Sequence, residues 1–95
     1  MSDHPADLGE LRDLLRDRIE ALAVELLGEH NRTLSTRKRW RWGGNGSLAV
    51  ELTGRKQGAW YSHEGGAGGG PLDLIRHANG GDLADAIAWA RGWIG

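Results

Sequence analysis

The stretch RKRWRWGGNGSLAVELTGRKQGAWYSH, residues 37–63, decides the expected fold because its side chains alternate with a period of two. An extended chain places Arg37, Arg39 and Arg41 on one side, and Lys38, Trp40 and Trp42 on the other. The pair Asn45-Gly46 tolerates the positive backbone angles of a tight turn, and SLAVEL resumes the alternation after it. These features predict a β-hairpin.

A second loop, TGRKQG at residues 53–58, follows the predicted hairpin and is bracketed by two glycines. Arg55 and Lys56 stand at its tip, and residues 59–63 read as a third strand. The sequence therefore predicts a basic three-stranded antiparallel sheet over residues 37–63.

The acidic segment of residues 1–30 predicts one amphipathic helix of about five turns. Asp7 and Glu10 have the spacing of a capping box, and Gly28 stands where a helix would end. The apolar stripe consists of Leu8, Leu11, Leu15, Ile19, Leu22 and Leu26. Further apolar residues widen it, namely Leu14, Val24 and Leu27. The stripe either packs only on the core or offers a second face to a partner or to another copy of the chain.

Two short helices are predicted within residues 71–94. Pro71 suits a first helical turn because it has no N–H to lose there, and Asn79-Gly80-Gly81 ends that helix. Asp82 is placed to cap the second one. The expected fold is α+β, a single small domain of residues 1–95 with an N-terminal helix, a three-stranded sheet and two C-terminal helices.

Composition excludes several classes of protein. The chain has 95 residues and no cysteine, so disulfides and cysteine-ligated zinc or iron-sulfur centres are ruled out. Its apolar runs are far shorter than the roughly 20 residues that span a bilayer, and MSDHPADLGE has no feature of a signal peptide. We expect a cytoplasmic protein.

Charge is distributed unevenly along the chain although its net value is only −1. Residues 1–30 carry three arginines against eight acids, residues 31–62 seven basic side chains against one Glu, and residues 63–95 two arginines against four acids. A basic middle segment is typical of proteins that bind an anionic partner, nucleic acid above all. The alternative is that this segment docks on the chain's own acidic helix.

The basic segment supplies the candidate binding site. Its cations would contact phosphates, and exposed rings near them would stack unpaired bases. We expect Trp60 to lie in the core and Trp42 and Tyr61 to be exposed, although a domain without Phe could bury any of these rings. The candidate nucleic-acid-binding residues are Arg37, Lys38, Arg39, Arg41, Trp42, Arg55, Lys56, Tyr61 and His63.

The glycine run GGAGGG, residues 65–70, does not match a known nucleotide loop. A Walker loop needs Lys followed by Ser or Thr where Pro71-Leu72 stands, and the dinucleotide fingerprint lacks its following acidic strand end. The run is expected to be a strand-to-helix crossover or a backbone contact for one phosphate. His63-Glu64 lacks the second His of a metalloprotease motif, because residue 67 is Ala. We predict no catalytic residue, metal or cofactor.

Residues 37–75 resemble the N-terminal zinc-ribbon module of bacterial and phage primases, of the toprim primase or primase-helicase type. The residues that match its order are Ser47, Val50, Gly58, Gly66 to Gly70 and Leu72 to Ile75. The cysteines that the family would place near Lys38 and around Trp60 to His63 are absent, so the resemblance is to a degenerate form without zinc.

The resemblance implies a zinc-ribbon-like sheet that holds single-stranded DNA during replication, in a phage or mobile element. It also implies a separate primase or helicase catalytic domain as a partner, and no catalytic activity in this chain by itself. The alternative function is a protein–protein interaction module that uses the N-terminal amphipathic helix.

Overall fold

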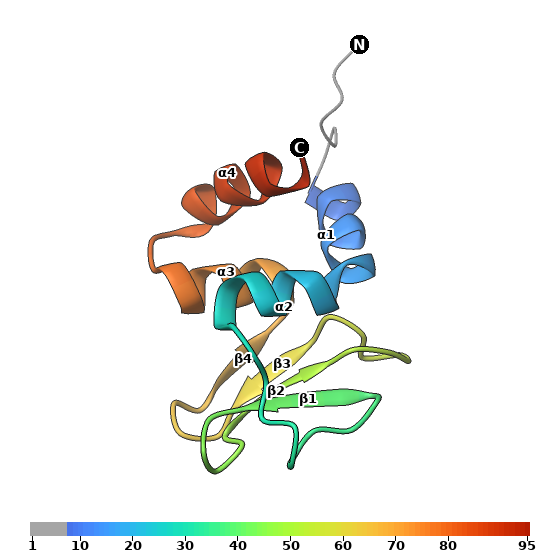
Figure 1. Cartoon of the computed structure of the whole chain (residues 1–95). Helices are drawn as coiled ribbons and strands as arrows, with labels where there is room; N and C mark the ends of the chain where they lie inside the picture. Colours follow the sequence, from blue (N-terminus) through green and yellow to red (C-terminus); the bar gives the residue numbers. More distant parts are fainter. Residues whose placement is uncertain (1–7) are drawn as a thin grey trace.

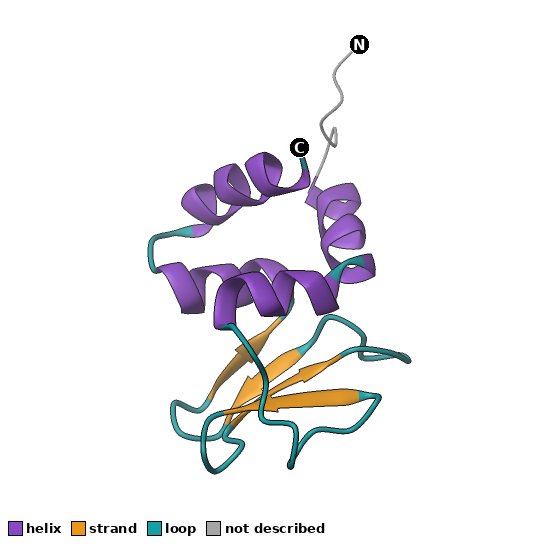
Figure 2. Cartoon of the chain, in the orientation of Figure 1, coloured by secondary structure: helices purple, strands orange, loops and turns teal. Residues whose placement is uncertain are grey.

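The computed structural model describes residues 8–95, which form four helices on one side of a four-stranded antiparallel sheet (Figure 1; Figure 2). The α+β class is as predicted, whereas the numbers of helices and strands are larger. The elements are α1 Leu8–Asp17, α2 Ile19–Leu27, β1 Arg39–Trp42, β2 Leu48–Glu51, β3 Trp60–Ser62, β4 Ala67–Gly69, α3 Pro71–Asn79 and α4 Leu83–Ile94. Asp7, half of the predicted capping box, lies outside the described residues.

The sheet is a meander in which each strand pairs with the next one along the chain. The first hairpin pairs Trp42 with Leu48, and the N–H of Gly46 donates to the carbonyl of Gly43 at 3.1 Å within its turn. Gly46 has a φ of +63°, and a Cβ there would lie 2.9 Å from Leu34. The hairpin predicted from GGNG is confirmed, and glycine is needed in it for both conformation and space.

The glycine run corrects the expectation of three strands. Residues 67–69 form β4, which pairs with β3 so that Tyr61 lies opposite Gly68 and Ser62 opposite Ala67. A run of glycines has no side-chain alternation and a low strand propensity, so the sequence pattern gives no sign of it. The crossover to α3 begins only after this fourth strand.

The N-terminal segment corrects the expectation of one continuous helix. Arg18 leaves the helical conformation with φ −109° and ψ 24°, and its N–H is shared between the carbonyls of Leu14 and Leu15 at 3.2 Å each. The chain changes direction there (Figure 1), so α1 contacts both α3 and α4 while α2 contacts α3. The leucine periodicity continues across the break, because Leu15 and Ile19 enter the same core.

The predicted helix ends are confirmed. Gly28 ends α2 with φ +79°, and Pro71 opens α3, which ends at Asn79 before Gly80. The Asp82 side chain accepts a hydrogen bond from the Asp85 N–H at 3.0 Å, and the Asp85 side chain accepts from the Asp82 N–H at 3.1 Å. This reciprocal capping box starts α4.

One core joins the helices to the inner face of the sheet. Its fully buried members come from every layer and include Leu11, Leu15, Ile19, Leu22, Val50, Leu74 and Ile75. Trp60 is buried as expected, and its Nε1–H donates to the carbonyl of Gly70 at 3.0 Å. Within residues 8–95, no helix has the length and apolar character needed to cross a membrane.

The connector before β1 covers the outer edge of the sheet. The N–H groups of Asn31 and Thr36 donate to the carbonyls of Arg41 and Arg39 at 2.6 and 2.8 Å, and the Ser35 hydroxyl accepts from the Arg41 N–H at 2.9 Å. These bonds occupy backbone groups that an edge strand would otherwise leave open to another chain.

Candidate nucleic-acid interface

Alternation along the strands divides the sheet into a helix-covered face and an open face. The covered face carries the cross-strand rows Trp42, Leu48, Ser62, Ala67 and Trp40, Val50, Trp60, Gly69. The open face carries the row Arg41, Ala49, Tyr61, Gly68 and beside it the pair Arg39 and Glu51. Because every helix lies on the covered side (Figure 2), the candidate interface is the open face.

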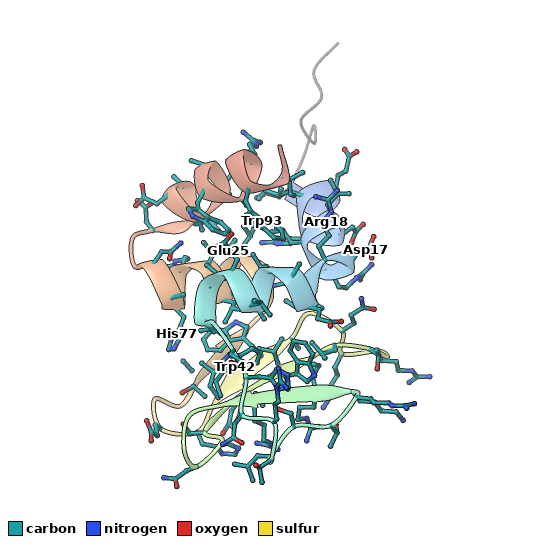
Figure 3. The ribbon with its side chains drawn as sticks, in the orientation of Figure 1. Asp17, Arg18, Glu25, Trp42, His77 and Trp93 are labelled. Atoms are coloured by element: carbon teal, nitrogen blue, oxygen red, sulfur yellow. The ribbon has the colours of Figure 1, made fainter. Side chains whose placement is uncertain are left out.

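The structure separates the two rings that the sequence expected to be exposed. Tyr61 is 49% exposed on the open face, as predicted. The expected exposure of Trp42 is wrong: this ring is 7% exposed, and its Nε1–H donates to the carbonyl of Gly28 at 3.1 Å. Trp42 lies between the helices and the sheet (Figure 3), because its strand position faces the core even though it borders a turn. A ring in that place stabilises the fold and is closed to a base.

A hollow of about 620 Å³ lies beside Tyr61 on the open face. Small residues pair with the tyrosine on both neighbouring strands, Ala49 on β2 and Gly68 on β4, and they leave space beside its ring. A Cβ on Gly68 would lie 2.8 Å from the Trp60 carbonyl oxygen and 3.5 Å from the Tyr61 ring. The His63 ring stands at 90° to the Tyr61 ring with the centroids 4.5 Å apart. Tyr61 therefore rises from a floor of small residues with His63 at one side.

The charged side chains of the open face form a mixed cluster. Arg39 and Glu51 face one another across β1 and β2 and make two hydrogen bonds, Nε to Oε2 at 2.6 Å and Nη2 to Oε1 at 2.8 Å. The hydrogen bond from Arg39 is the main cause of a lowered pKa at Glu51, and the nearby charges of Arg39, Lys56 and Arg41 lower it further. The carboxylate thus stays ionised, and part of the Arg39 charge is neutralised.

Two of the five remaining predicted cations line the hollow, and three do not. Arg41 and Lys56 line it, and the Arg41 guanidinium also donates to the Gly46 carbonyl at 3.1 Å. Arg55 is exposed beside Lys56 in the loop between β2 and β3. Arg37 and Lys38 are exposed but precede β1, so the structure does not place them in its alternation.

Ion pairs give no support to docking of the basic segment on the acidic helices. The pairs recorded within residues 8–95 are Asp13 with Arg16, Glu29 with Arg32, and Arg39 with Glu51, and the first two do not reach the sheet. The third pair lies within the open face itself, so none of these pairs joins the sheet to the acidic helices.

The helix start after the glycine run is not free for a phosphate. The Asp73 carboxylate accepts a hydrogen bond from the Gly70 N–H at 3.0 Å, so an anion already sits at the beginning of α3. The run contributes to the hollow instead, through Gly68 and Gly69. The His77 ring lies beside the buried Trp60, with the centroids 4.7 Å apart, whereas the His63 ring lies beside Tyr61 on the open face.

Glu51 and the small residues of the floor are the members of the site that sequence reasoning missed. Residues in SLAVEL alternate between the two faces of the strand, so Ala49 and Glu51 lie on one face and the apolar Leu48 and Val50 on the other. The length of the turn sets the register of the hairpin: because Trp42 pairs with Leu48, Arg39 pairs with Glu51 three residues farther along each strand. Among the described residues, no three His, Cys, Asp or Glu side chains gather closely enough to hold a metal ion.

No protein-family model matches the chain, and neither a curated protein nor a solved structure shows significant similarity to it. The geometry of the open face is therefore the basis for a function.

Proposed function

We propose that this chain is an accessory domain that binds single-stranded DNA on the open face of its sheet, in the manner of a primase zinc ribbon without its metal. The observation that carries the proposal is the exposed Tyr61 ring above a floor of small residues, with cations around it. Base-stacking on exposed aromatic side chains beside a cationic path is a common way to bind unpaired strands.

Each group would have a separate role. Tyr61 would stack one base in the hollow, which at about 620 Å³ has the size of a small-molecule site. Arg41, Lys56 and Arg55 would contact phosphates on either side of that base. Phosphate contacts of this kind carry little sequence information, so the affinity from them would be general and dependent on salt. The packed tryptophans, Trp42 and Trp60, would do the structural work that zinc does in a ribbon.

Fluorescence anisotropy of a labelled single strand tests the proposal. With three phosphate contacts, log K should fall against log salt with a slope of about −2, which lowers affinity roughly 20-fold between about 50 mM and 200 mM salt. Tyr61→Ala should weaken binding by about 1–3 kcal/mol, the usual contribution of one stacked base. Absence of binding at low salt, or binding indifferent to salt, would contradict the proposal.

A matched pair of double variants separates local from general charge effects. Arg55→Gln with Lys56→Gln removes two exposed cations beside the hollow, and the slope should fall to about −0.7. Arg12→Gln with Arg91→Gln removes two exposed cations from α1 and α4, and both slope and affinity should stay near the wild type. Equal losses from the two double variants would mean that binding follows net charge and not the open face.

A groove among the helices favours the second candidate function, protein interaction. Its apolar lining includes Val24, Trp40 and Trp93, and its charged lining consists of three acids, Asp17, Glu20 and Glu25, against one base, Arg18. Figure 3 shows Asp17, Arg18, Glu25 and Trp93 in this region. Val24 is 45% exposed there, and the acids suit a partner helix that carries basic and apolar side chains. Of the residues predicted to form a second face, Val24 would belong to this working surface together with Trp93 of α4, whereas Leu14 and Leu27 do not line the groove.

Titration with a synthetic amphipathic Leu/Lys helix, followed by tryptophan fluorescence, tests this second function. Val24→Ser should weaken binding because it removes the apolar contact without adding charge, whereas Leu34→Ser, at another exposed apolar position outside the groove, should not. A peptide of the same composition in scrambled order should bind poorly. Equal binding of both peptides would remove this candidate.

A further inference from the structure

A carboxylate, that of Glu51, lies among the basic side chains of the open face. Glu51 lines the hollow beside Tyr61, and its side chain is 19% exposed. Its pKa is lowered, first by the hydrogen bond from Arg39, so it is ionised at neutral pH. A negative charge here reduces attraction for phosphates, which makes Glu51 a poor component of a surface built only for the DNA backbone.

We propose that Glu51 reads the base stacked on Tyr61 and favours bases that carry an exocyclic amino group, adenine, cytosine and guanine, over thymine and uracil. This inference rests on the proposed function, because it names the ligand class of the same hollow.

The position of Glu51 fits this role. Ala49 lies opposite Tyr61 and the Glu51 N–H donates to the Ala59 carbonyl at 2.8 Å, so Glu51 and Tyr61 are diagonal neighbours on one face. Such neighbours lie about 7–8 Å apart, a separation that an aromatic base on the tyrosine can bridge. Ala59 also lines the hollow and leaves that side of Tyr61 without a bulky neighbour.

The hydrogen bonds of Glu51 leave acceptor capacity for a ligand. Arg39 donates one N–H to each carboxylate oxygen, and an ionised carboxylate has about four acceptor sites. Each oxygen therefore keeps one lone pair. The same pair with Arg39 holds the carboxylate in one orientation, so little side-chain entropy is lost when a base binds.

The chemistry of the bases supplies the selectivity. An exocyclic amino group donates a hydrogen bond to a carboxylate, and glutamate accepts one in this way from the cytosine N4 amine. Uracil and thymine present a carbonyl oxygen at that position, which a carboxylate repels, and their ring donor, N3–H, lies between two such oxygens. Cytosine and uracil have the same ring size and stack similarly, so they form a matched pair of probes.

Anisotropy titrations of oligodeoxycytidine and oligodeoxyuridine of equal length, at neutral pH and low salt, test the inference. We expect the wild type to bind the cytosine strand at least about tenfold more tightly, in line with the contribution of one hydrogen bond to a charged group. Glu51→Gln should reduce this ratio below about twofold, because its amide can also donate to the uracil oxygen. Glu64→Gln removes the same charge from an exposed turn position outside the hollow and should keep the wild-type ratio.

The outcomes distinguish this inference from the proposed function. Equal affinity of the wild type for the two strands overturns the selectivity while single-strand binding stands, and no binding to either strand overturns the proposed function. A wild-type ratio in Glu51→Gln overturns the role of Glu51. A second comparison needs no variant: oligodeoxyadenosine should bind more tightly than the same strand of deoxynebularine, a purine without the amino group, and equal affinities would also overturn the inference.

Discussion

Single residues decide which aromatic rings can meet a ligand. Trp42 and Tyr61 both belong to the predicted sheet of residues 37–63, yet one is buried and the other is half exposed. The difference comes from the face of the sheet on which each side chain lies. Trp42 lies in a row with Leu48 on the covered face, and Tyr61 lies in a row with Arg41 and Ala49 on the open face. Residue type alone does not separate them, because both rings combine a large apolar area with a polar atom.

Gly68 gives a test of the floor beneath Tyr61. A Cβ at residue 68 would press on the Trp60 carbonyl oxygen, a backbone atom that cannot turn aside. Gly68→Ala should therefore destabilise the domain by about 1–3 kcal/mol, as overpacking does. Gly44→Ala, where nothing lies within 4 Å of the added Cβ, should change stability by less than about 1 kcal/mol. Urea titrations followed by circular dichroism measure both, and equal losses would contradict the close packing at Gly68.

Elements are delimited in this chain mainly by caps that are local in sequence. Gly28, Pro71 and Asp82 act through their own backbone angles or through atoms three residues away, so the sequence was sufficient to place these boundaries. The break at Arg18 is different in kind. No Gly or Pro marks it, and it lets two halves of one apolar stripe approach α3 in different directions.

The cap of α4 predicts a dependence of stability on pH. Hydrogen bonds from the Asp85 backbone lower the pKa of Asp82 in the folded state. The ionised cap therefore stabilises the domain above the ordinary carboxyl range, and this contribution is lost as pH falls through the lowered pKa. Asp82→Asn keeps a capping oxygen without the charge. The melting temperature of the wild type should exceed that of the variant at neutral pH, and the difference should shrink in acid; a constant difference would contradict the role of the charge.

One hydrophobic core holds the domain together, and α3 is central to it because this helix contacts the other three helices and β4. The same covering leaves the opposite sheet face open, so the cations and Tyr61 gather there (Figure 2). The packing of the helices on one face of the sheet therefore forms the core and also leaves the side chains of the other face available for a ligand.

Leu74 tests whether helices and sheet unfold together. Its side chain is fully buried in α3, so Leu74→Ala should cost about 2–5 kcal/mol. Because the core is shared, far-ultraviolet circular dichroism, which follows the helices, and tryptophan fluorescence should shift to the same lower urea midpoint. Val24→Ala, at an exposed helical position, serves as the control with little change. Separate midpoints for the two signals would contradict a single cooperative core.

Local features could be predicted from the amino-acid pattern: the α+β class, the hairpin at Asn45-Gly46, the helix ends at Gly28, Asn79 and Asp82, and the burial of Trp60. The fourth strand, the break at Arg18, the burial of Trp42 and the pairing of Glu51 with Arg39 depend on contacts between elements. Alternation states which side chains share a face, but which face is covered depends on where the helices pack. Glycines, likewise, become a strand only when a neighbouring strand offers its hydrogen bonds.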